Sequence, residues 1–453
     1  MTRIAEPRTI YLDSFSRHAN GNGQTWVNHL RKAAIDRFAE VGFPGPRDEE
    51  WRFTNLSPIV RTGFKPAGIP AAALAEQAAR KFSLGKQAGA ELVFVNGRFS
   101  QALSTRGDLP AGVCVGNLYD LLKVDSRRIE QHLGRHADLS VNPFVALNTG
   151  FIHDGAYIYL PEGTAIRRPL HLLFVSVPDG QPAVAHPRVL VVAGDRVDAT
   201  IVETYGGAGE GIYFTNAVTE IAAGENCRLD HCRMQQETLE ACHVATMAVE
   251  LGRETQFISH AASIGSRVAR NDLSVVLNGE YADATLNGLV VIGGDQHVDN
   301  HTLLRHEKPN CPSHELYKHV LDGRASGVFK GKIFVQKDAQ KTNSKQTSKS
   351  LLLSDDASMN SQPALEIYAD DVKCTHGSTT GPVDEEMVFY LRSRGISLEA
   401  ARHLLTYAFA ADITRRIRVE PVRARIEDFM AAQHGLPQDL RITDLGSHDQ
   451  AAL

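Results

Sequence analysis

The sequence predicts a mainly β protein with α-helical regions at both ends, and three observations support this fold class. Apolar residues recur at helical spacing before about residue 150. Short β-branched runs, separated by Gly, Asn and Asp, fill residues 151–382 without long helical patterns between them. Helical spacing returns in residues 383–453. We therefore divide the chain into an N-terminal mostly helical region (1–150), a β core (151–382) and a C-terminal helical region (383–453).

The N-terminal region contains a predicted helix over residues 25–41. Its apolar positions are Trp26, Leu30, Ala34, Phe38 and Val41, at steps of three or four. Thr25 belongs to a residue type that caps helices, and the glycines and prolines of residues 42–46 end the pattern. Residues 70–81 predict an alanine-rich helix. Residues 91–99 predict a strand, with Asn96 and Gly97 as a turn signal.

The β core is marked by runs of strand-forming residues. These runs are 156–160, 189–192, 217–221, 273–277, 288–292 and 332–335. Short strands at a spacing of roughly 8 to 12 residues, with no helices between them, are typical of sandwiches, barrels and β-solenoids.

Side chains alternate in character within residues 281–291. The small or apolar set is Ala282, Ala284 and Leu286, and the polar set is Asp283, Thr285 and Asn287. A narrow solenoid interior that faces solvent on its outer side requires this alternation. Five glycines fall where tight corners are expected: Gly279, Gly288, Gly293, Gly294 and Gly323. The pattern favours an irregular β-helix and leaves a sandwich open.

The character of the sequence changes again at Gly381 and Pro382, just before the C-terminal region. Helical spacing runs from Ser397, a suitable capping residue, to Ile417, and we expect Pro421 to end this helix. A second helix is predicted over residues 426–433, closed by Gly435.

Composition limits the classes of function. The formal net charge of −5 argues against a general nucleic-acid binder. Six cysteines in 453 residues are too few and too irregularly spaced for a disulfide framework. The sequence shows neither an apolar signal core at its start nor a run of about 18 apolar residues. We expect a cytoplasmic protein that does not enter membranes.

The candidate site is a cysteine and a histidine two positions apart, Cys374 and His376. In an extended segment these side chains project from the same face. A thiol beside an imidazole suits a soft metal or sulfur chemistry. By spacing alone, a buried cysteine beside a structural histidine is the more common arrangement.

Other motifs give weaker indications. The segment Gly327–Ile333 lacks P-loop spacing, so the chain is not a P-loop ATPase by itself. Four lysines at every fourth position predict a solvated face; these are Lys337, Lys341, Lys345 and Lys349. Aspartate pairs at 355–356 and 370–371 fit turns better than a carbohydrate-active site. We find no defensible Ser/His/Asp arrangement.

Histidines and cysteines also concentrate between residues 227 and 319. The cysteines there are Cys227, Cys232 and Cys242, with Cys311 further on. None of the spacings matches a zinc finger or ribbon, and we expect most of these thiols to be packed. Two alternatives nevertheless stay open at this point: a β-helix enzyme acting on carbohydrate and a zinc-binding structural protein.

Several segments together resemble the SufB/SufD family of iron–sulfur cluster assembly scaffolds. They are residues 49–54, 328–335, 339–342, 346–354, 374–381 and 389–396. The resemblance covers the second half of the chain well and the first half thinly. The Cys-x-His pattern at Cys374 and His376 is more similar to SufD than to SufB, and residues 346–354 lack the cysteine that SufB-type chains carry there.

The resemblance implies a fold, partners and a cargo. The fold would be a right-handed parallel β-helix between helical ends. The partners would be a SufB-like subunit, as a heterodimer, and a SufC-like ABC ATPase bound by the C-terminal helical region. This non-catalytic subunit would support assembly of a transient iron–sulfur cluster shared with SufB, using His376 as a direct ligand and Cys374 as a secondary one. Flavin binding, cluster nuclearity and homodimerisation without partners are left open.

Overall fold

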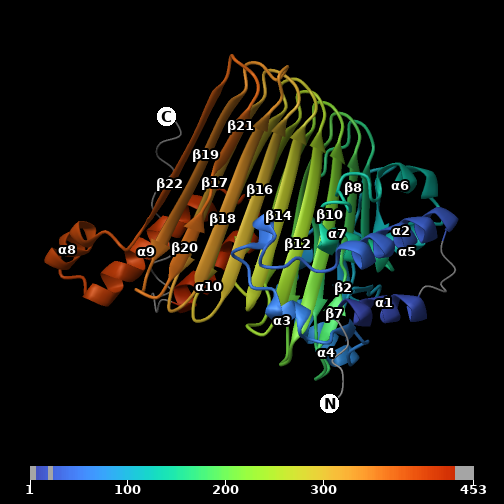
Figure 1. The fold of residues 1–453 in the computed structure, drawn as a ribbon, viewed down its shortest axis with the longest axis horizontal. Coiled ribbons are helices and arrows are strands. Elements are labelled where there is room, and N and C mark those ends of the chain that lie inside the picture. Colours follow the sequence, from blue (N-terminus) through green and yellow to red (C-terminus); the bar gives the residue numbers. More distant parts are fainter. Residues whose placement is uncertain (1–6, 19–23, 434–453) are drawn as a thin grey trace.

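The fold of this protein is a parallel β-solenoid with helical regions at both ends, seen in a computed structural model that describes residues 7–18 and 24–433 (Figure 1). The solenoid has about eight turns between residues 156 and 381. The predicted fold class, a β core with helical ends, is thereby confirmed, and a sandwich is excluded because the strand pairs formed within residues 156–381 are parallel.

Successive strands alternate between two sheets, so that each turn contributes one strand or strand pair to each. The first sheet contains β4 (Cys114–Asn117), β5 (Ala156–Leu160), β8 (Arg188–Ala193), β10 (Tyr213–Ala223), β12 (Cys242–Leu251), β14 (Val268–Leu277), β16 (His297–His306), β18 (Ser326–Val335), β20 (Ser358–Ser361) and β21 (Ala364–Ile367), with β1 (Lys65–Pro66) and β7 (Ala183–Ala185) off the main path. The second contains β3 (Arg98–Phe99), β2 (Ala90–Val95), β6 (Leu170–Ser176), β9 (Asp198–Gly207), β11 (Arg228–Gln236), β13 (Gln256–Ser263), β15 (Asp283–Ile292), β17 (Pro312–Leu321), β19 (Asn343–Leu352) and β22 (Lys373–Gly381).

The interior between the sheets is filled by alternate side chains of each strand. Ala282, Ala284 and Leu286 are fully buried there, as the alternation predicted. The corner prediction is wrong for Gly288, which lies inside β15. A Cβ at this position would overlap the ring of Tyr317 from the next turn, so glycine is required for close stacking. Gly279, Gly293, Gly294 and Gly323 do lie between strands.

The N-terminal region packs mainly on the outer face of the first sheet. Its helices are α1 (Pro7–His18), α2 (Thr25–Val41), α3 (Ser57–Val60), α4 (Ala72–Phe82), α5 (Leu118–Leu121), α6 (Ser126–His132) and α7 (Pro143–Gly150). The predicted helix 25–41 is confirmed, but Thr25 is its first helical residue and not its cap. Asn96 and Gly97 form the predicted turn, between β2 and β3. Aromatic contacts between Trp51, Phe144 and Phe214 join this region to β10.

The C-terminal region comprises α8 (Glu385–Ser393), α9 (Leu398–Thr414) and α10 (Glu420–Gln433). Ser397 caps α9 as predicted, its Oγ accepting a hydrogen bond from the Ala400 N–H at 3.2 Å. The prediction for Pro421 is wrong, because α9 ends at Thr414 and Pro421 lies in the first turn of α10, where a missing N–H does no harm. Gly435 lies outside the described residues. Among the described helices, none is long and apolar enough to cross a membrane.

Candidate functional site

Cys374 and His376 lie on β22, the last strand of the second sheet. β22 pairs with β19 on one side, and its other side is the free edge of the sheet. Figure 1 shows this strand at the end of the solenoid furthest from the N-terminal helices. The predicted pair therefore stands where a further strand could add to the sheet.

Both side chains project from the inward face of β22. Cys374 is in register with Ser344, and His376 with Gln346, and both partners are buried in the interior of the preceding turn. Ser378, on the same face, donates to the Ser361 Oγ at 2.8 Å and so bridges β22 to the other sheet. Cys374 is half-buried and His376 is exposed because no further turn covers them.

The environment of Cys374 favours the protonated form of its thiol in the isolated chain. Burial raises the pKa of Cys374, and the backbone N–H of Ser344 offsets only part of this effect. A thiol is a weak ligand until it loses its proton, and bound metal or a nearby positive charge promotes that loss. Cys374 would therefore become a strong ligand only when metal arrives.

The pair does not make a complete metal site. Within residues 7–18 and 24–433, no three His, Cys, Asp or Glu side chains are arranged to hold a metal ion. The histidines and cysteines between residues 227 and 319 therefore do not come together as a zinc site in the described structure. Cys227, Cys232, Cys242 and Cys311 are buried, as expected for packed thiols. Two candidate ligands at a free edge would leave the remaining coordination positions to another molecule.

Two buried polar residues, which the sequence analysis missed, lie behind His376 in the interior. Gln346 in β19 is in register with His376, and Glu315 in β17 is in register with Gln346. The Gln346 Nε2 donates to the Glu315 Oε2 at 2.7 Å. Burial raises the pKa of Glu315 to about 7, and the opposing effects of the Thr302 and Gln346 side chains offset this only in part. Glu315 and Gln346 are 31 residues apart, and Gln346 and His376 are 30 apart. These spacings are the only sequence signal for the alignment, and they can be interpreted only when the length of a turn is known.

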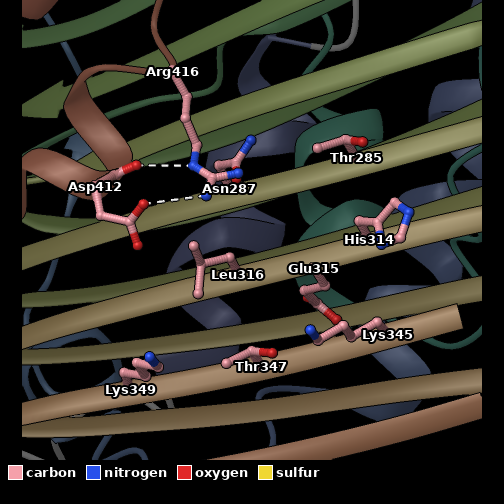
Figure 2. Close-up of a pocket in the computed structure, with 10 residues that line it drawn as sticks. All are labelled: Thr285, Asn287, His314, Glu315, Leu316, Lys345, Thr347, Lys349, Asp412 and Arg416. Carbon is pink, nitrogen blue, oxygen red and sulfur yellow. Dashed lines mark hydrogen bonds and ion pairs between the residues drawn. The ribbon is translucent and has the colours of Figure 1, made fainter. Parts of the chain in front are cut away.

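A shallow cavity of about 310 Å³ lies beside these strands, on the outer face of the second sheet against α9 (Figure 2). Figure 2 shows Lys345 and Lys349 on one strand, with Asp412 and Arg416 on the helix across from them. Arg416 is occupied by the Asp412 side chain and carbonyl. The four regularly spaced lysines are all exposed, which confirms the predicted solvated face.

A second unusual surface lies on α8. Met387, Phe389 and Tyr390 are 45%, 74% and 49% exposed. Figure 1 shows α8 standing away from the solenoid, with only α9 beside it. Glu385 and Glu386 precede these residues on the same helix. A helix that exposes three large apolar side chains has a surface suited to another protein.

Comparisons with known proteins agree with this architecture. A model of the SUF system FeS cluster assembly SufBD core domain matches residues 175–409, and one of the SufBD protein N-terminal region matches residues 8–172. An iron–sulfur cluster assembly SufBD family protein of Synechocystis is 34% identical, with 91% of this chain and 92% of the relative covered.

Two proteins named SufD also match over most of their length. The iron–sulfur cluster assembly protein SufD of Escherichia coli is 29% identical, over 86% of this chain and 89% of the relative. The SufD protein of Bacillus subtilis is 24% identical, over 92% and 95%. Matches to both family models and to a relative of nearly equal length lead to one assignment: the chain belongs to the SufBD family of iron–sulfur cluster assembly proteins.

Proposed function

We propose that this chain is a SufD-like scaffold subunit without a catalytic activity of its own. It pairs with a SufB-like subunit, binds a SufC-like ABC ATPase and contributes ligands to a nascent iron–sulfur cluster before that cluster is transferred. In this proposal the β core (151–382) carries the cluster site and the SufB contact, and residues 383–453 carry the ATPase contact. The observation on which the proposal chiefly depends is the incomplete ligand pair at the free edge of β22.

The chemistry of the pair suits a transient cluster. A thiolate is a soft ligand for iron–sulfur clusters, and an imidazole can replace a thiolate at one iron. We assign His376 as the direct ligand because it is exposed, whereas Cys374 is half-buried and its thiol holds its proton more tightly. A cluster that must be transferred is released more easily when each subunit supplies few ligands.

The free edge also supports the pairing with a second solenoid. An unpaired sheet edge offers backbone N–H and C=O groups to a strand of another chain. A strand added beside β22 would place its own side chains within one strand spacing, roughly 4.8 Å, of Cys374 and His376. The missing ligands could then come from that partner.

The test of this proposal is assembly in the complete complex. The full chain is produced with SufB- and SufC-type partners, and co-purification, iron and sulfide content and the rate of cluster formation are measured. We expect a stable complex in which His376→Ala lowers the rate more than about tenfold. Cys374→Ala should have a smaller effect.

Thr375→Ala is the matched control, because Thr375 lies between the two residues on the opposite face of β22. It should form clusters at the wild-type rate. Wild-type rates in both His376→Ala and Cys374→Ala would contradict the ligand assignment. A failure to co-purify with either partner would contradict the scaffold role.

A further inference from the structure

The interior of the last two complete turns holds a polar ladder that ends at the candidate site. It consists of Glu315, Gln346 and His376, which occupy equivalent positions in β17, β19 and β22. In-register residues of a parallel sheet point to the same face about one strand spacing apart. Leu286 precedes Glu315 in the same row, so the polar ladder begins at Glu315.

The hydrogen bond between the first two members sets the direction of the Gln346 amide. Its Nε2 donates to Glu315, and both side chains are at most 3% exposed. The Oε1 of Gln346 is buried and has no hydrogen-bond partner among the described residues. Leaving a buried acceptor unsatisfied is unfavourable, so an N–H group placed beside it would be held firmly.

The opposite sheet leaves space for this amide. Gly331 in β18 faces Gln346 across the interior, and a Cβ at Gly331 would overlap the Gln346 Nε2. The amide is thus held between a glycine on one side and a carboxyl group on the other. Such confinement fixes a side chain whose amide would otherwise rotate.

We propose that Gln346 and Glu315 are positioning residues for His376. When the His376 imidazole turns toward the interior, the Oε1 of Gln346, which has no partner in the present arrangement, accepts the imidazole N–H. Glu315 holds the amide in the orientation that presents this oxygen. One ring nitrogen then keeps its proton, and the other directs its lone pair toward the open end, where the metal would bind. The inference rests on the proposed ligand role of His376.

The direct test is the tautomeric state of His376 in the metal-free full chain, read from the ring ¹⁵N resonances. The His376 signal is identified by its absence in His376→Ala. We expect one well-defined tautomer in the wild type and an averaged pair of nitrogen shifts in Gln346→Leu, which is close in shape but accepts no hydrogen bond. In the complex, Gln346→Leu should slow cluster formation about 10- to 100-fold.

Four further variants separate positioning from general structure. Glu315→Gln still offers an oxygen to the amide and should keep the tautomer, whereas Glu315→Leu should lose it. Gly331→Ala should disturb the tautomer from the opposite sheet by displacing the amide. Ser350→Ala, on the same face of β19 but in register with Thr380, should change nothing.

The outcomes distinguish this inference from the proposed function. An unchanged tautomer in Gln346→Leu overturns the positioning role, even when His376→Ala abolishes cluster formation. If the tautomer changes in Gln346→Leu but His376→Ala forms clusters at the wild-type rate, the hydrogen bond between Gln346 and His376 is supported and the ligand role of His376 is contradicted. An averaged tautomer in the wild type overturns the inference directly.

Discussion

At the scale of single residues, the solenoid interior shows how hydrogen bonding decides the charge of a buried carboxyl group. Burial raises the pKa of Glu203, but His231, Tyr205 and Thr219 all bond to its carboxyl group, and the net result is a lowered pKa. Glu315 is equally buried, and the effects of Thr302 and Gln346 offset its burial only in part, so its pKa is raised. The two groups share a charge type and differ in their partners, because only Glu203 has a histidine beside it.

Glu315 should therefore make stability depend on pH. Its pKa is about 7 in the folded chain against 4.5 as the usual value. Between these values the unfolded chain ionises while the folded chain keeps its proton, so rising pH destabilises the fold, by about 3 kcal/mol when complete. Glu315→Gln should remove this loss. Chemical unfolding from pH 4 to 8 would show the variant gaining stability over the wild type as pH rises.

Glu210→Gln is a suitable control for this experiment, because Glu210 is exposed in the connection between β9 and β10. It should leave the pH dependence unchanged. A stability difference between Glu315→Gln and the wild type that stays constant across this range would contradict the prediction.

At the scale of elements, a buried lysine adds polar contacts to the apolar packing that joins α9 to the solenoid. Lys318 projects outward from β17, is 5% exposed, and its Nζ donates to the Phe409 carbonyl at 2.9 Å. The same Nζ pairs with Asp412 at 2.8 Å. The Lys318 stem also lies against apolar neighbours, and its ammonium lies 4.6 Å from the Phe409 ring centre. The Lys318 side chain thus contacts a backbone carbonyl, a carboxylate and an aromatic ring of the same helix.

Lys318→Met should loosen α9 without unfolding the solenoid. The variant keeps most of the apolar stem but loses both polar contacts, which together stabilise docking by about 1–3 kcal/mol. Hydrogen exchange should accelerate in α9, about 5- to 100-fold, and stay unchanged in β13 and β15. Lys345→Met, an exposed lysine on the same outer face, is the control. Equal exchange in α9 for both variants would contradict this role of Lys318.

At the scale of the whole molecule, the two ends of the solenoid differ in what covers them. The N-terminal helices pack over the first turns, whereas the last turn ends in a free strand and a projecting helix, α8 (Figure 1). The surfaces suited to other proteins therefore gather at the C-terminal end.

Phe389→Ser should weaken binding of the ATPase subunit without lowering the stability of the isolated chain. Phe389 is 74% exposed, so its removal costs little in the folded chain, but an exposed aromatic residue at an interface centre contributes about 2 kcal/mol or more. Affinity for the SufC-type subunit should fall at least about 30-fold, by calorimetry. Val124→Ser, equally exposed in the N-terminal region, should bind normally. If Phe389→Ser binds the SufC-type subunit with wild-type affinity, this subunit does not bind at Phe389.

Much of this architecture could be predicted from the sequence, and the exceptions have physical causes. The bounds of α2 follow from the regular spacing of apolar residues, of which Ala34 and Phe38 are buried. α8 was missed because Phe389 and Tyr390 are apolar and exposed, which removes the pattern of a helix with one buried face. The pair Cys374 and His376 could be identified, but its ladder with Gln346 and Glu315 could not. Turn lengths vary, so register across turns is fixed by packing and not by a repeat.

β22 pairs with only one strand, and this affects how cooperatively the end of the solenoid unfolds. In a solenoid, each turn is stabilised mainly by nearest-neighbour interfaces, as in a one-dimensional chain. Interior strands have two such interfaces, and β22 has one. Local opening is therefore least costly where Cys374 and His376 lie, and it spreads inward from that terminus. A strand that docks on the free edge would convert a fraying end into an internal unit, so binding and ordering of the metal ligands would occur as one event.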